Sequence, residues 1–62
     1  MYKLAKLLNR MDDNSNIIVC MDGKRDNDYR GSARKVPFEL SQLPIIAVET
    51  QDGELCVTVA EV

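Results

Sequence analysis

Two arginines and a tyrosine form the first group of residues in this sequence that could bind a ligand. Arg30 and Arg34 carry planar guanidinium forks that suit a phosphate or a carboxylate, and Tyr29 adds an aromatic ring beside them. If residues 28–35 form a strand, the two arginines share one face and lie roughly 13 Å apart. This spacing predicts a site for a small nucleotide or another anion, completed between subunits because so short a chain cannot bury it alone. The alternative is a charged strand face that discourages edge pairing.

Acidic side chains form a second candidate site in the C-terminal half. All eight lysines and arginines precede position 36, so the first 35 residues carry +3 (eight bases, five acids) and the last 27 carry −5 (five acids), which sum to −2. An acidic surface can bind a basic protein surface and compete with nucleic acid for it. Glu49, Asp52 and Glu54 are the residues that we expect to make such a protein-binding contact.

Side chains suited to catalysis are sparse. The sequence has no histidine, and it contains no Gly-x-Ser-x-Gly elbow, no glycine-rich phosphate loop and no metal-ligand spacing. Cys20 lies among Ile, Val and Met residues without an imidazole base, so its thiolate is disfavoured. Asp12 and Asp13 fit a turn after a helix better than a pair of catalytic carboxylates. We therefore expect a protein that is not an enzyme and that uses no cofactor and no metal.

Length and cysteine content limit how the chain can be stabilised. Its 62 residues predict a single domain, and a domain of this size buries only about 60% of the surface that its unfolded chain exposes. Cys20 and Cys56 lack the close spacing of a zinc site and are expected to be free thiols in strands. Self-association is the remaining aid to a small core, which favours a homo-oligomer. With no signal-peptide pattern and no apolar run of roughly 20 residues, the protein is expected to be soluble, cytoplasmic and away from the membrane.

A β-hairpin over residues 44–62 is the clearest structural feature. Two runs rich in Ile and Val flank Asp52-Gly53, a pair favoured where both central residues of a two-residue turn need positive φ. The turn sets the register, which pairs Ala47 with Thr58 and then Ile46 with Val59. Alternation places five residues on the buried face: Ile46, Val48, Leu55, Val57 and Val59. Four residues face the other way: Ala47, Glu49, Cys56 and Thr58.

The remaining segments predict two helices and two further strands. Residues 3–11 are expected to form a helix with an apolar stripe on the sheet and a solvated basic face. The stripe is Leu4, Leu7, Leu8 and Met11, and the basic face is Lys3, Lys6 and Arg10. The unbroken apolar strand 17–21 predicts cover on both faces, within the chain or from another copy, unless Ile18 and Cys20 are simply exposed. After the strand 28–35, residues 36–43 are expected to form a short helix that Pro44 ends.

Together these elements predict a single α+β domain over residues 1–62, in the order α-β-β-α-β-β. The simplest architecture is an N-terminal helix and a short second helix on one face of a four-stranded antiparallel sheet, built from two hairpins. The other face would carry mostly small residues, which would admit a close partner.

Several stretches spread over the chain match a known pattern. They are Lys3-Leu-Ala-Lys-Leu-Leu8, Met11-Asp12-Asp13, Ile17-Ile18-Val19, Tyr29-Arg30-Gly31, Val36-Pro37 and the closing run from Val48 to Val59. In these stretches the chain resembles a loose group of very short phage and prophage proteins of Gram-positive bacteria. The resemblance implies a phage-encoded inhibitor that binds a protein of a host defence system in the host cytosol, for example a nucleic-acid-binding CRISPR effector. Two alternatives stay open: an oligomeric sponge that sequesters a cyclic-nucleotide immune signal, and a structural accessory phage protein.

Overall fold

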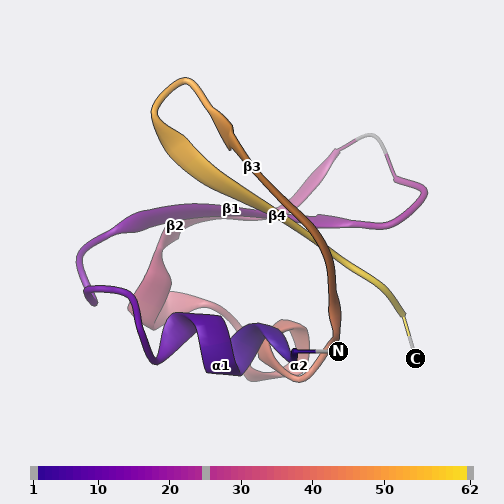
Figure 1. The fold of residues 1–62 in the computed structure, drawn as a ribbon, viewed down its shortest axis with the longest axis horizontal. Helices are drawn as coiled ribbons and strands as arrows, with labels where there is room; N and C mark the ends of the chain where they lie inside the picture. Colours follow the sequence, from indigo (N-terminus) through magenta and orange to yellow (C-terminus); the bar gives the residue numbers. More distant parts are fainter. Residues whose placement is uncertain (1, 25, 62) are drawn as a thin grey trace.

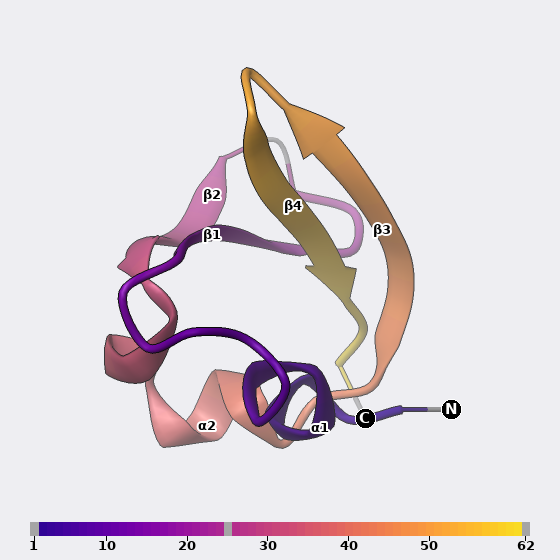
Figure 2. The ribbon, with the colours of Figure 1, turned by 60° about the vertical axis from the view of Figure 1, so that its left-hand side comes forward.

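In the computed structural model, which describes residues 2–24 and 26–61, a helical layer lies against one face of a four-stranded sheet (Figures 1 and 2). The helices are α1 (Leu4–Leu8), the 3₁₀ helix η1 (Ala33–Lys35) and α2 (Phe38–Ser41). The strands are β1 (Asn16–Met21), β2 (Asn27–Ser32), β3 (Ile45–Gln51) and β4 (Glu54–Val59). The expected small α+β fold, with two α-helices and four strands in one sheet, is confirmed. Neither described α-helix is long enough to cross a membrane.

The sheet is mixed, so the prediction of a purely antiparallel sheet was wrong. Its strand order is β2-β1-β4-β3, and the two central strands run parallel, with Ile17 opposite Leu55 and Met21 opposite Val59. Each central strand pairs antiparallel with the other strand of its own hairpin. The helix η1 is a further element that the predicted order lacked.

The connection between the two hairpins explains the parallel pairing. After β2 the chain passes through η1 and α2 under the sheet before β3 begins at the opposite edge (Figure 2). Such a crossover returns the chain to the end of the sheet where the preceding strand started, so β3 takes the direction of β2 and β4 takes that of β1. Turn residues determine each hairpin by itself and contain no information on this relative direction.

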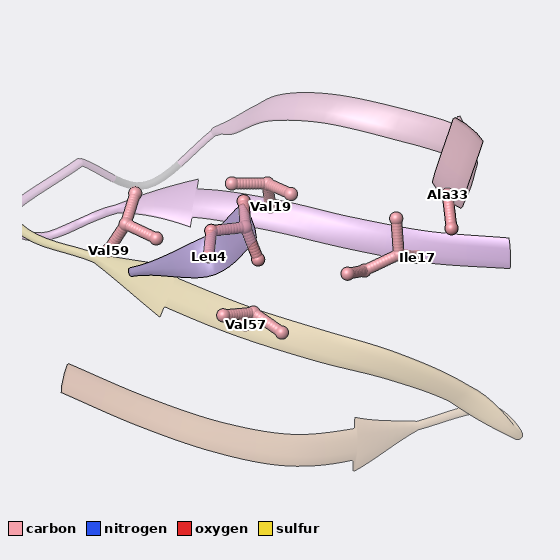
Figure 3. Packing of buried hydrophobic residues seen from close by; sticks show 6 residues of the cluster. All are labelled: Leu4, Ile17, Val19, Ala33, Val57 and Val59. Atoms are coloured by element: carbon pink, nitrogen blue, oxygen red, sulfur yellow. The ribbon is translucent and has the colours of Figure 1, made fainter. Parts of the chain in front are cut away.

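The core lies between α1 and the centre of the sheet. Figure 3 shows Leu4 of α1 pointing at the side chains of the two central strands. Among the described residues, the largest fully buried side chains are Leu4, Ile17, Val19, Val57 and Val59. The rest of the predicted stripe, Leu7, Leu8 and Met11, packs against this cluster, although α1 ends at Leu8 rather than at residue 11. The helical spacing thus identified the correct face of the N-terminal segment.

The turn of the β3–β4 hairpin has the predicted geometry. Asp52 and Gly53 have φ values of 53° and 80°, so both adopt the left-handed conformation that this two-residue turn requires. The register counted outward from the turn is confirmed as far as Ala47, which lies opposite Thr58. Local turn chemistry is therefore enough to set most of this hairpin.

The hairpin differs from the prediction near the start of β3. A bulge pairs Ile45 rather than Ile46 with Val59, so Ile46 leaves the buried face and is 44% exposed. The N–H of Ile45 donates to the carbonyl of Tyr2 at 2.7 Å, which holds this end of β3 against the N-terminal segment. Val48, also predicted to be buried, is 52% exposed, because β3 is an edge strand and α1 covers the central strands.

Ile18 lies on the sheet face opposite the core cluster, yet it is only 4% exposed. Its cross-strand neighbours are Arg30 on β2 and Cys56 on β4. The Arg30 side chain reaches Glu54, so an ion pair connects the strands on either side of Ile18. The unbroken apolar run of β1 is thus explained within one chain and gives no argument for a second copy.

Replacing Leu4 with alanine should lower the free energy of unfolding by about 2–5 kcal/mol, because it leaves a cavity between α1 and the central strands. Phe38→Ala is the control. It removes a larger side chain that is 75% exposed, and should change the free energy of unfolding by less than about 0.5 kcal/mol. Urea unfolding followed by circular dichroism measures both values. Similar losses in the two variants would show that α1 does not close the core.

Candidate binding surface

The structure does not bring the three predicted anion-binding residues together. Tyr29 lies on the core side of β2, where its hydroxyl donates to the carbonyl of Ser32 at 2.6 Å. Arg30, the next residue along the strand, lies opposite Ile18 on the other face of the sheet, away from the helices. We call this the outer face. Arg34 lies in η1, beyond the end of β2. The two arginines therefore do not share a strand face.

The end of β2 explains why the arginines separate. Ala33 is 4% exposed, and its N–H donates to the carbonyl of Ser15 at 2.8 Å. The chain therefore leaves the sheet after Ser32 rather than at residue 35 and turns into η1. Arg34 is exposed beside the helical layer, next to a hollow that Asn9 also lines. Because buried Ala33 begins η1, residues 33–35 do not continue the strand or its alternation of faces.

Arg30 and Glu54, which belong to different predicted sites, form an ion pair with each other. Arg30 Nη2 lies 3.3 Å from Glu54 Oε2, and the Glu54 side chain is 22% exposed against 64% for Arg30. Glu54 Oε2 accepts no aligned hydrogen bond from any described residue, so the guanidinium is the charge that offsets it. Both side chains are thus already paired with each other and not with an outside ligand.

Glu49 and Asp52 are the exposed members of the predicted acidic group. Glu49 lies on the outer face of β3, opposite Cys56. Asp52 lies in the turn that follows β3. The tip of the hairpin therefore carries two exposed acids, Glu49 on the outer face of β3 and Asp52 in the turn, while Glu54 is held by Arg30.

The outer edge of β3 is open along most of its length. Lys3 forms an isolated bridge with Pro44 at its start, and no described strand pairs with the rest of this edge. In a hairpin with a two-residue turn, hydrogen-bonded and non-hydrogen-bonded pairs alternate outward from the turn. Val48 and Thr50 are in non-hydrogen-bonded pairs, opposite Val57 and Leu55. Their N–H and C=O groups therefore point away from β4, where another strand could pair with them.

The opposite edge of the sheet, along β2, is less suited to strand pairing. It carries Asp28 and Arg30, and Lys24 Nζ lies 3.6 Å from Asp28 Oδ1. The β1–β2 pairing also contains a bulge. Charges and bulges discourage the addition of a strand. On β3 the bulge is confined to the start of the strand, and Ile46 and Val48 are exposed apolar residues.

A groove of about 220 Å³ lies between α1 and β3. Six residues line it: Tyr2, Lys6, Leu7, Arg10, Ile45 and Val48. Lys6 in α1 and Arg10 in the turn after it are both exposed, and Lys6 Nζ lies 4.7 Å from the centre of the Tyr2 ring, within cation–π range. The groove thus combines an apolar floor with two positive charges, directly beside the open edge of β3.

The groove was not predicted from the sequence, although a basic helix face that contains Lys6 and Arg10 was expected. Their i, i+4 spacing places them on one side of the predicted helix 3–11, where a solvated basic face was expected. The structure sets this face beside Val48, which comes from the other end of the chain. Because Val48 was expected to be buried, no pattern in the sequence connected it with the two cations.

Comparisons with protein-family models, with curated proteins and with solved structures found no match. Within residues 2–24 and 26–61, no three His, Cys, Asp or Glu side chains gather in a way that could hold a metal ion. The open edge of β3, the groove beside it and the acidic outer face together form the β3 surface, the candidate binding surface of the protein.

The ion pair between Arg30 and Glu54 should give a coupling energy of about 0.2–1 kcal/mol in a double-mutant cycle of Arg30→Ala and Glu54→Gln. Urea unfolding at low salt measures it, and added salt should reduce it. The same cycle with Arg34→Ala is the control, because Arg34 forms no ion pair with any described residue. Equal coupling in both cycles would contradict a specific contact.

Proposed function

We propose that the protein acts by binding another protein, and that the partner adds an extended segment to the open edge of β3. The observation that carries this proposal is the position of the outward backbone groups of Val48 and Thr50 beside an apolar groove. When a strand is added to a sheet edge, main-chain hydrogen bonds provide affinity and pockets for alternate side chains provide selectivity. The β3 surface offers both.

The charges on the two sides of β3 define the kind of segment that fits. Side chains of an added strand alternate between the two faces of the sheet. On the helical face they meet Lys6 and Arg10 over an apolar floor, which favours apolar or acidic residues. On the outer face they meet Glu49 and, near the turn, Asp52, which favours basic residues. The partner segment therefore alternates basic residues with apolar or acidic ones.

The proposal keeps two of the three acidic residues expected to bind a partner. Glu49 and Asp52 contact the partner, whereas Glu54 holds Arg30 and so supports the outer face. The resemblance to small phage proteins supports a partner from a bacterial host defence system, such as a nucleic-acid-binding effector. Such effectors bind nucleic acid through basic side chains, and a contact of those side chains with Glu49 and Asp52 would inhibit them.

Sequestration of a small nucleotide has no comparable support in the geometry. Tyr29 is turned to the core, Arg30 is paired with Glu54, and Arg34 lies in η1. A site built from these three residues would need a second copy of the chain to supply the missing walls. Protein binding on the β3 surface needs only the single chain.

Thr50→Pro tests whether the partner pairs with the backbone of β3. Proline removes the outward N–H of residue 50, while the hydrogen-bonded pairs at Glu49 and Gln51 keep β3 on β4. Affinity for a partner captured from bacterial extract should fall by about tenfold or more, as expected for lost main-chain hydrogen bonds. Thr50→Ala keeps the N–H and should bind like the wild type. Isothermal titration calorimetry measures all three affinities.

A second pair of variants tests the groove. Val48→Lys replaces an apolar residue of the groove with a charged one that an added strand would have to bury, and should weaken capture of the partner, as Thr50→Pro does. Phe38→Lys changes an exposed apolar residue away from β3 and should bind normally. Circular dichroism checks that each variant is folded. A wild-type chain that captures no protein specifically, or a partner that binds Thr50→Pro and Val48→Lys like the wild type, would refute the proposal.

A further inference from the structure

Cys20 and Cys56 meet on the outer face of the sheet, although they are 36 positions apart in the sequence. Their Sγ atoms lie 3.7 Å apart across the two central strands. Cys56 is 5% exposed and Cys20 is half-buried. The Cys20 thiol also donates a hydrogen bond to Asn27 Oδ1 at 3.2 Å. Both residues are free thiols in strands, as expected, but their contact is a result of the parallel pairing of β1 and β4.

We propose that Cys20 and Cys56 form a reversible redox site, which a low-molecular-weight disulfide such as oxidised glutathione converts to an intramolecular disulfide. The contact between the two sulfurs carries this proposal, because it makes the bond-forming step intramolecular. The site lies outside the groove and does not depend on the partner proposed for β3.

The reaction begins at Cys20, because Cys56 is buried. The Cys20 thiolate attacks one sulfur of oxidised glutathione, which gives a mixed disulfide and releases one glutathione thiolate that takes up the proton. Cys56 then loses its proton and attacks the Cys20 sulfur, which displaces the second glutathione as a thiol. The protein loses two hydrogens and forms one S–S bond, and the glutathione disulfide is reduced to two thiols.

The strand register makes this disulfide easy to reduce. Cys20 lies opposite Thr58 and Cys56 opposite Ile18, so the bond spans a diagonal between neighbouring strands. A strand spacing of about 4.8 Å and a two-residue rise of about 6.6 Å place diagonal Cα atoms roughly 8 Å apart before twist is considered. Unstrained disulfides need Cα atoms within about 6.8 Å of each other. The two central strands must therefore shift when the bond forms, and a strained bond of this kind is readily broken by thiols.

The surroundings of Cys20 keep the site reduced until an oxidant is present. Burial, the contact with Cys56 and the carboxylates of Asp28 and Glu49 raise the pKa of the Cys20 thiol above its ordinary value. Cys20 is therefore protonated at neutral pH, and only a small thiolate fraction can attack. The site thus reacts slowly, unlike a thiol whose pKa is lowered.

Intact-mass spectrometry of the folded wild-type chain tests the proposal without any substitution. The reduced protein is incubated with oxidised glutathione, quenched with acid and measured without reductant. The expected product is a monomer about 2 Da lighter than the reduced chain, without bound glutathione, which dithiothreitol converts back. The same incubation in concentrated urea is the control. There the thiols are no longer held in contact, and glutathione adducts should form a larger share of the product.

Two variants separate the roles of the thiols. Cys56→Ala should accumulate one glutathione on Cys20, because the thiol that displaces it is absent. Cys20→Ala should stay unmodified while folded, because the remaining thiol is buried. The proposal is overturned if folded wild-type protein stays reduced in excess oxidised glutathione, binds two glutathiones, or forms a disulfide-linked dimer instead of the lighter monomer.

Discussion

The parallel pairing of β1 and β4 joins the two hairpins into one sheet and buries most of the core. A chain of 62 residues has little apolar surface to bury, and these two strands contribute most of it. Val19 and Val57 meet Leu4 on the helical face. On the other face, Ile18 and Cys56 are covered without any helix. Since both faces of this pair are buried, the two hairpins must join through it, and each outer strand becomes an edge.

This arrangement also decides where a partner can bind. With β1 and β4 in the centre, β2 and β3 are the edges of the sheet. Asp28 and Arg30 of β2 form ion pairs, whereas Glu49 of β3 forms none with any described residue. The five residues of α1 cover the central strands and leave β3 uncovered beyond its start. The groove and the open edge are thus two consequences of placing a short helix over the middle of the sheet.

Folding redistributes the charges of the chain from its two halves to the two faces of the sheet. Arg30 from the basic half neutralises Glu54 from the acidic half. The exposed charges beside β3 then include Lys6 and Arg10 on the helical face, Glu49 on the outer face and Asp52 in the turn. A partner therefore meets opposite charges on the two sides of one strand, although the linear sequence separates bases from acids.

Patterns in the sequence were enough to predict the local features: the turn at Asp52-Gly53, the hairpin register near it, the apolar face of α1 and the exposure of Glu49 and Asp52. Turn preference and periodicity act over a few residues, so neighbouring positions suffice to predict these features. Four other features follow only from the folded chain: the direction of one hairpin against the other, the bulge at Ile46, the early end of β2 and the contact between Cys20 and Cys56. These features depend on where the crossover through η1 and α2 returns the chain, and residues far apart in the sequence come together only once that path is set.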